Sequence, residues 1–314
     1  MKIVVVGPGA MGCLFGAFLA QSGEEIYFLD KNELRAKEIQ EKGISVEGLS
    51  NFLVKKIKAT TNPQEIGKTE LVIIATKSYD TEEAMRKAIS IINNETLVLT
   101  LQNGLGNVEI INKYISLEQI VAGVTNEGAT LLGIGHVRHA GKGETVIGLC
   151  QKSPFEKEKE RLEEIVEIFR KAGFETHSTP GVENIIWSKL IINIGINALT
   201  AITRLNNGRL PEFPGTNQIM RLAVDEAVKV ARKKKIKLLY EDPIKKVEEV
   251  CRLTSGNISS MLQDVLRKRK TEIDFINGAI VKEGEKLGIP TPINSVLTNL
   301  VKSIETSYSL QIYS

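Results

Sequence analysis

The sequence feature that most constrains the fold is a glycine loop near the N-terminus. Residues 7–12 read GPGAMG and fit the pattern GxGxxG. The apolar run Lys2–Val6 before them is typical of a parallel strand buried on both faces, and residues 10–22 after them have helical spacing. In that context the glycines allow a tight turn, a close backbone approach to a pyrophosphate, and helix packing on the strand. We therefore expect dinucleotide binding, rather than a purely structural turn, at Gly7, Gly9, Ala10, Met11 and Gly12.

The nucleotide preference depends on two residues that follow the second expected strand. Asp30 lies 18 residues after Gly12, close to the roughly 20 expected of an acid that binds the ribose 2′-hydroxyl, which favours NADH. Lys31 follows immediately and could instead pair with the 2′-phosphate of NADPH. Asp30 could also cap the helix that begins near Asn32. These residues alone leave the choice open.

Strand and helix patterns alternate over the first half of the chain, which predicts a mostly parallel α/β sheet. The segment Thr179-Pro180-Gly181 marks a break, and the pattern beyond it is almost entirely helical. We expect a Rossmann-like doubly wound α/β domain over residues 1–180 and an all-α substrate domain over residues 181–314, with a cleft between them as the default site. The helices expected in the second domain span residues 182–203, 216–235, 243–251, 258–269, 272–287 and 293–307.

Composition and charge exclude several classes of partner. The 41 basic and 38 acidic residues leave a net charge of +3, too small to indicate nucleic acid, and the basic run at residues 267–270 is interpreted as a solvated helix face. The three cysteines and three histidines form no metal-spaced cluster, so we expect neither disulfides nor a bound metal. The N-terminal apolar run is too short for a signal peptide, and the apolar stretch at residues 190–199 falls short of a membrane span. We expect a cytoplasmic protein with no membrane partner.

Two polar segments follow further strands of the expected sheet. They are Thr76-Lys77-Ser78 and Gln102-Asn103-Gly104. In doubly wound folds ligands bind at the carboxyl edge of the sheet, which makes both segments site candidates. The alternatives are a solvated loop charge at Lys77 and a plain turn at Asn103.

The first helix of the second domain carries a polar stripe among apolar residues. Lys189, Asn193 and Asn197 recur at a spacing of four and share one face. A buried amide without a partner costs roughly 1 to 3 kcal/mol, so the stripe either forms a satisfied network between helices or faces a ligand. Ketone reduction needs a proton as well as the hydride that a nicotinamide supplies. A lysine whose pKa is lowered by burial can donate that proton, which makes Lys189 our candidate general acid.

Several motifs over essentially the whole chain together resemble the ketopantoate reductase (2-dehydropantoate 2-reductase) family. They are GPGAMG at residues 7–12, Thr76-Lys77, Gln102-Asn103-Gly104, KLIINIGINALT at 189–200, Asn206-Asn207-Gly208, and NISSMLQDVLRKRKTEIDFING at 257–278. The last segment is far more specific than any glycine loop.

The resemblance implies reduction of 2-dehydropantoate to (R)-pantoate, a step of pantothenate and coenzyme A biosynthesis. It implies that Lys189 is the general acid, that Glu272 holds the substrate hydroxyl and pairs with the lysine in the empty site, and that Ser260 binds the substrate carboxylate. Asn103 would lie beside the nicotinamide ribose and the reacting centre. The remaining implied substrate contacts are Asn193, Asn197, Asn207 and Asn257.

The resemblance also bears on the cofactor and on alternative functions. The family generally prefers NADPH and uses basic residues where this chain has Lys31 and Lys77, but the adjacent Asp30 leaves NADH as an alternative. A reductase of another small 2-keto acid is the first rival function, and a non-catalytic NAD(P)-sensing protein is the second. A homodimer is compatible with the sequence.

Overall fold

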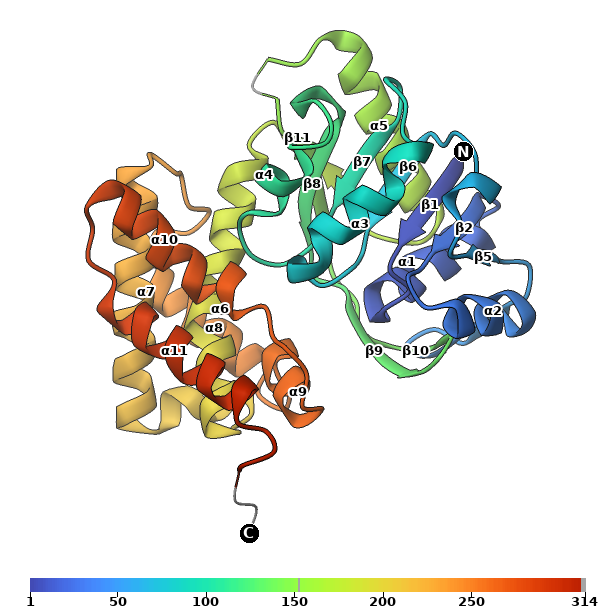
Figure 1. Ribbon diagram of the computed structural model, residues 1–314. Coiled ribbons are helices and arrows are strands. Elements are labelled where there is room, and N and C mark those ends of the chain that lie inside the picture. Colours follow the sequence, from blue (N-terminus) through green and yellow to red (C-terminus); the bar gives the residue numbers. More distant parts are fainter. Residues whose placement is uncertain (152, 312–314) are drawn as a thin grey trace. The chain divides into compact units, whose positions relative to one another are not determined.

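The chain folds into two compact units, and its computed structural model describes residues 1–151 and 153–311 (Figure 1). The first unit comprises residues 1–102 and 107–182, and the second comprises residues 103–106 and the chain from Glu183 onward. Among the described residues, every strand belongs to the first unit, while the second unit is helical.

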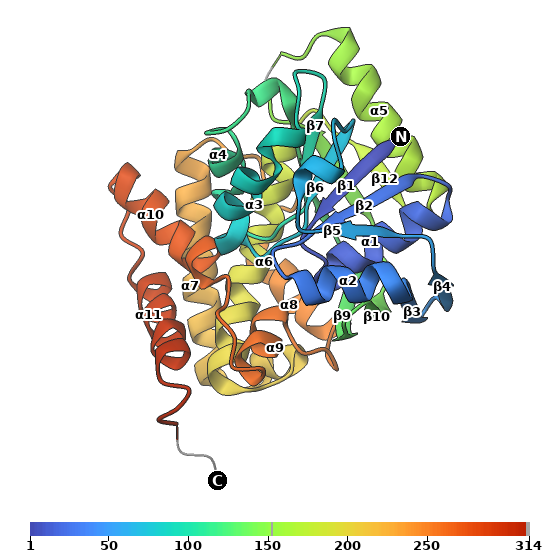
Figure 2. The same cartoon turned by 45° about the vertical axis from the view of Figure 1, so that its right-hand side comes forward.

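An eight-stranded sheet forms the centre of the first unit, in the order β12-β11-β8-β7-β6-β1-β2-β5. Strand β11 runs antiparallel to β8, whereas the other neighbours are parallel. Figure 2 shows β6, β1, β2 and β5, which follow one another to one edge of the sheet. The strands are β1 (Lys2–Val6), β2 (Glu25–Leu29), β5 (Lys58–Thr60), β6 (Leu71–Ile74), β7 (Leu97–Thr100), β8 (Ile120–Thr125), β11 (Thr145–Leu149) and β12 (Thr176–Ser178).

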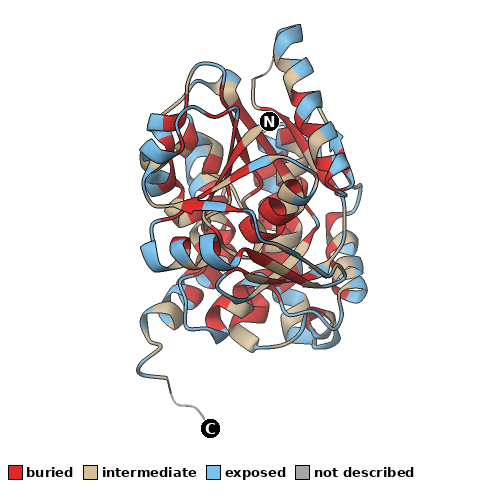
Figure 3. Ribbon diagram, turned by 90° about the vertical axis from the view of Figure 1, so that its right-hand side faces the viewer, coloured by how far each residue is buried: buried red, intermediate tan, exposed pale blue. Residues whose placement is uncertain are grey.

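Helices cover both faces of this sheet. In β1, Ile3 and Val5 belong to a core that includes helices α1 and α5, whereas Val4 and Val6 belong to a core that includes α3. Burial on both faces explains why these strands are continuous apolar runs, and Figure 3 shows them as predominantly buried. The helices of this unit are α1 (Ala10–Gln21), α2 (Glu33–Lys42), α3 (Thr81–Ala88), α4 (Asn107–Ile111) and α5 (Glu156–Lys171).

The strand order reverses at β1. From β1 the chain adds β2 and β5 on one side and then β6, β7 and β8 on the other. A Cβ atom at Gly7 would lie 2.6 Å from the Thr76 side chain, so the loops after β1 and β6 meet at the carboxyl edge of the sheet. Doubly wound sheets bind their ligands at such a switch point.

A second sheet of four strands, in the order β4-β3-β10-β9, packs against α1. Strands β3 and β4 follow each other along the chain and pair antiparallel. Strand β3 also pairs with β10, about 90 residues later, and the sequence contains no local signal for that pairing. The strands are β3 (Ile44–Gly48), β4 (Phe52–Val54), β9 (Gly128–Gly133) and β10 (His136–Gly141).

Helix α6 forms part of the core of the second unit, where Trp187, Ile191 and Ile194 are buried. By length and composition α6 could cross a membrane, contrary to the expectation from residues 190–199. Two-thirds of its most apolar window (67%) is nevertheless buried, as in the core helix of a soluble protein. The helices are α6 (Val182–Thr203), α7 (Pro214–Lys233), α8 (Pro243–Leu253), α9 (Ser260–Leu266), α10 (Asn277–Leu287) and α11 (Pro292–Thr306).

Two expectations for the second unit are wrong in detail. The helix predicted over residues 272–287 is instead a 3-10 turn, Ile273–Phe275, followed by α10, because the backbone of Ile276 (φ −108°, ψ −95°) breaks the helix between them. The basic run at residues 267–270 is exposed but lies beyond the end of α9, where Lys268 adopts a left-handed φ of 52°. It is a solvated turn, not a helix face.

Candidate active site

The glycine loop connects β1 to α1 at the switch point, as the sequence predicts. Gly7 has a φ of +92°, and a Cβ atom at Gly12 would lie 2.2 Å from the carbonyl oxygen of Gly7, so both positions need glycine for structural reasons. Gly9 differs, because its φ of −78° is ordinary and the nearest atom to its Cβ would be the Ala75 carbonyl oxygen at 3.9 Å. Nothing in the fold requires glycine there, whereas close approach of a pyrophosphate does. The loop therefore fits a dinucleotide.

The carboxylate of Asp30 is nearly fully buried (2% exposed) at the end of β2 and is already well satisfied. It accepts hydrogen bonds from Nε and Nη2 of Arg35 and from the backbone N–H groups of Lys31 and Asn32. The alternative that Asp30 caps the next helix is wrong, because Asn32 is the N-cap of α2. Asp30 thus has little remaining capacity to accept a ribose hydroxyl.

Positive groups gather around Asp30. The ammonium group of Lys31 is exposed and lies 3.3 Å from Asp80 and 2.9 Å from Glu83. These carboxylates raise the pKa of Lys31, mainly through the hydrogen bond that its ammonium group donates to Glu83. The Arg35 side chain is about one-third exposed, and its guanidinium lies against the Asp30 carboxylate. Arg35 was not among the predicted site residues, and its only sequence signal is its place one turn into α2.

The segments after β6 and β7 are tied together within the first unit. The Nε2 atom of Gln102 donates to the carbonyl oxygen of Thr76 at 2.9 Å and to Thr81 Oγ1 at 2.9 Å. This bridge fixes the loop that carries Lys77, the residue immediately before the 3-10 turn Ser78–Asp80.

Residues 103–106 follow directly but pack within the second unit. The backbone N–H of Leu105 donates to the Phe275 carbonyl oxygen at 2.8 Å, an acceptor left available by the helix break at Ile276. Gly104 has a φ of +88°, and a Cβ atom there would lie 2.2 Å from the same oxygen. Asn103 therefore belongs to the same unit as Glu272. Glu272 lies close to the Leu105 contact along the chain, because its carbonyl oxygen accepts a hydrogen bond from the Phe275 N–H at 3.0 Å.

Lys189 lies on α6 and has an unusual proton affinity. Burial lowers the pKa of its ammonium group from 10.5 to about 8, and the negative charge of Glu272 opposes that shift. Glu272 is itself buried, with 7% of its surface exposed. A lysine with this pKa can release a proton near neutral pH, as a general acid must.

Asn193 and Asn197 follow Lys189 at one-turn intervals along α6. Among residues 1–151 and 153–311, no hydrogen bond joins either side-chain amide to another group of the protein, and none of their amide atoms is fully buried. Within the described residues these two amides are therefore not part of a hydrogen-bonded network between helices. They offer hydrogen-bonding capacity beside a lysine of lowered pKa.

Asn257 and Ser260 are both exposed on the segment that leads into α9. Asn207 is 8% exposed and holds this segment, because its Nδ2 atom donates to Thr254 Oγ1 at 3.0 Å and its backbone N–H donates to the Asn257 carbonyl oxygen at 3.1 Å. Its Oδ1 atom is buried and has no hydrogen-bond partner among the described residues. The residue that caps α9 is Ser259, which the sequence did not single out.

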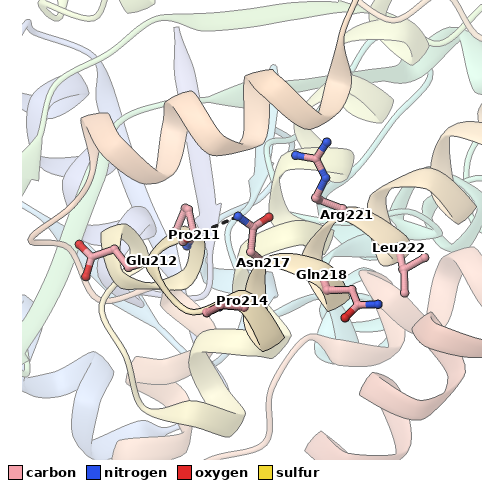
Figure 4. A pocket seen from close by; sticks show the side chains of 7 residues that line it. All are labelled: Pro211, Glu212, Pro214, Asn217, Gln218, Arg221 and Leu222. Atoms are coloured by element: carbon pink, nitrogen blue, oxygen red, sulfur yellow. Dashed lines mark hydrogen bonds between the residues drawn. The ribbon is translucent and has the colours of Figure 1, made fainter.

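A surface hollow of about 630 Å³ lies elsewhere in the second unit, at the start of α7 (Figure 4). None of its lining side chains was predicted as a site residue, and Asn217 donates across it to the Pro211 carbonyl oxygen at 3.1 Å. We assign no chemistry to it. The lining residues are Pro211, Glu212, Pro214, Asn217, Gln218, Arg221 and Leu222.

Both halves of the chain match family models. Residues 3–152 match the model for ketopantoate reductase PanE/ApbA, and residues 181–305 match the model for its C-terminal part. The chain belongs to the ketopantoate reductase family. The Rossmann-like first domain, which binds NAD(P) in this family, and the helical second domain agree with the fold expected from the sequence.

Relatives cover the chain almost end to end. The 2-dehydropantoate 2-reductase of Archaeoglobus fulgidus is 35% identical over 306 residues, 97% of this chain and 98% of that protein. The 2-dehydropantoate 2-reductase of Pyrococcus horikoshii is 36% identical over 306 residues, which are 98% of this chain and 98% of that protein. The crystal structure of a PanE/ApbA family ketopantoate reductase from Ralstonia eutropha JMP134 has a TM-score of 0.89 at 33% identity, covering 98% of this chain and 100% of that one. The structure of D-mandelate dehydrogenase with NADH and anilino(oxo)acetate has a TM-score of 0.88 at 31% identity. The match covers 99% of this chain and 100% of that one.

Proposed function

We propose that the chain reduces 2-dehydropantoate to (R)-pantoate with NADPH, as a cytoplasmic step of pantothenate and coenzyme A biosynthesis. The observation that carries the proposal is Lys189, whose pKa is lowered to about 8. It shares α6 with the amides of Asn193 and Asn197, which have no hydrogen-bond partner among the described residues. Family membership and the names of the relatives support the choice of substrate.

A bound nicotinamide would supply the hydride for the keto carbon, and we propose that Lys189 supplies the proton. As the carbonyl oxygen gains negative charge, the Lys189 ammonium group donates its proton there and becomes a neutral amine. Glu272 accepts a hydrogen bond from the substrate hydroxyl, and Ser260 binds the carboxylate. Asn103, Asn193, Asn197 and Asn257 orient the substrate, so that much of the acceleration would come from positioning.

For the cofactor we propose NADPH in first place. Asp30 already accepts hydrogen bonds from Arg35 and two backbone N–H groups, which argues against its use for a ribose hydroxyl. The pairs of Lys31 with Asp80 and Glu83 are exposed, and such pairs are weak enough to exchange for a phosphate. Lys31 and Lys77 would then contact the 2′-phosphate end, and Gly7, Gly9, Ala10, Met11 and Gly12 the pyrophosphate.

A second candidate function is reduction of a different 2-keto acid. The structure of D-mandelate dehydrogenase, 31% identical to this chain, was solved with NADH and anilino(oxo)acetate. Its likeness to this chain makes an aryl 2-keto acid and NADH specific competitors.

The test is spectrophotometric. NADPH and NADH oxidation would be followed with 2-dehydropantoate, an aryl 2-keto acid and small aliphatic 2-keto acids as substrates, and we expect the highest kcat/KM with 2-dehydropantoate and NADPH. A higher value with the aryl acid would establish the second candidate, and no oxidation with any acid would favour a nucleotide sensor.

A matched variant tests the lysine. Lys189→Ala should bind NADPH normally by fluorescence titration but keep less than about a tenth of wild-type turnover, since a general acid contributes roughly 10²- to 10⁴-fold. Greater retention would remove Lys189 from the mechanism.

A further inference from the structure

Two hydroxyl groups join the helix with the polar stripe to the segment that carries Asn257 and Ser260. The Oγ1 atom of Thr200, three residues beyond Asn197 on α6, lies 2.7 Å from the Oγ atom of Ser259. Thr200 is fully buried and Ser259 is 7% exposed. The contact is therefore shielded from competing water.

Either hydroxyl could be the donor, and one arrangement gives both hydroxyl protons an acceptor. Ser259 Oγ accepts from the backbone N–H of Leu262 at 3.1 Å. Thr200 Oγ1 lies 3.0 Å from the carbonyl oxygens of Ile196 and Asn197, which can only accept. In that arrangement the single Thr200 proton is shared between these carbonyls, and Ser259 donates to Thr200. The result is one continuous chain of hydrogen bonds from the first turn of α9 to the backbone of α6 at Asn197.

The same segment is held again a few residues earlier. The N–H groups of Asn207 and Gly208 donate to the carbonyl oxygens of Asn257 (3.1 Å) and Ser255 (3.3 Å). A Cβ atom at Gly208 would lie 2.5 Å from the Cβ of Ser255, so the two backbones approach closely. Residues 255–259 are thus fixed at both ends, while the side chains of Asn257 and Ser260 remain exposed.

We propose that Thr200 and Ser259 are positioning residues, which set the separation between the Asn197 amide and the Ser260 hydroxyl and so the fit of a keto acid between them. The proposal rests on the proposed function, because it assigns both groups to one substrate. Neither Thr200 nor Ser259 touches the substrate in this view. Their effect should therefore fall on the keto acid and spare the nucleotide.

Steady-state kinetics of Thr200→Val and Thr200→Ser test the proposal. Valine keeps the shape of threonine but leaves the Ser259 hydroxyl without its acceptor, whereas serine keeps the acceptor. Because a displacement of about 1 Å can cost roughly 10²-fold in rate, we expect Thr200→Val to raise KM for 2-dehydropantoate at least about tenfold with KM for NADPH unchanged. Thr200→Ser should stay within about twofold of wild type. An unchanged KM for the keto acid in Thr200→Val, or an equal rise for both substrates, overturns the proposal.

Hydrogen exchange provides a measurement that needs no turnover. The Leu262 amide should exchange faster in Thr200→Val than in wild type or Thr200→Ser, because its acceptor Ser259 is then no longer held. Equal protection in all three proteins also overturns the proposal. Wild-type protein that reduces no keto acid would count against the proposed function instead, so the two failures are distinguishable.

Discussion

The rate of keto acid reduction should fall as the pH rises through about 8. Lys189 must be protonated to act as general acid, and its pKa is lowered to about 8 by burial, against the opposing charge of Glu272. At pH 9 a group with a pKa of 8 is about 9% protonated, whereas an ordinary lysine with a pKa of 10.5 is about 97% protonated. We therefore expect kcat/KM for 2-dehydropantoate at pH 9 to be roughly a tenth of its value at low pH, with a further tenfold loss per pH unit above that.

Glu272→Gln is the informative perturbation of this profile. It removes the carboxylate charge that favours protonated Lys189, so the descending limb of kcat/KM should move to lower pH. Since Glu272 is also a proposed substrate ligand, kcat/KM should fall at every pH as well. The test is therefore the pH at which the limb has its midpoint, and not the maximum value of kcat/KM. Lys189→Arg serves as a control, because a permanently charged side chain should show no limb near pH 8. A wild-type profile that stays flat to pH 10, or a Glu272→Gln midpoint at or above the wild-type one, would refute the reasoning.

Three further predictions concern the first unit. Lys31→Ala should raise KM for NADPH roughly tenfold more than KM for NADH, because a charge-assisted contact to the 2′-phosphate is lost. Equal changes for the two nucleotides would contradict the proposal that Lys31 binds the 2′-phosphate. Gly9→Ala should weaken cofactor binding in a fluorescence titration without lowering Tm. Gly12→Ala should lower Tm, because its Cβ would lie 2.2 Å from the Gly7 carbonyl oxygen. A lower Tm in Gly9→Ala with unchanged cofactor binding would show that Gly9 is structural. His139→Leu should lower the free energy of unfolding in urea by about 3 kcal/mol. It removes the ring that is bonded to the buried Glu127 carboxylate at 2.7 Å and leaves it only the longer hydrogen bond from the Gly143 N–H at 3.3 Å. A loss below about 1 kcal/mol would show that the pair contributes little.

Local patterns were sufficient to predict the elements and the fold class. The glycine loop between an apolar run and a helix, and the helix over residues 182–203, are both formed as the sequence predicts. These features depend on periodicity and turn chemistry, which act over a few residues. The same holds for the placement of Lys189, Asn193 and Asn197 on one helix.

What the sequence did not reveal depends on contacts between distant segments. Asp30 satisfies the spacing rule for a ribose ligand, but Arg35 occupies it, and spacing alone cannot report a competing partner. The helix break falls at Ile276, just before the turn-like dipeptide Asn277-Gly278, but these two residues begin α10 instead of forming a turn. The Thr200 and Ser259 contact joins residues 59 positions apart, and each looks like an ordinary helix or cap residue by itself.

The packing of residues 103–106 within the second unit has a consequence for modular engineering. A gene cut at the domain boundary near residue 181 would yield an N-terminal fragment that carries Asn103–Gly106 without Phe275. The C-terminal fragment would lack residues 103–106, which pack within its unit. The two halves are therefore not interchangeable modules. Chimeras between family members should keep residues 103–106 and the Phe275 loop from the same parent.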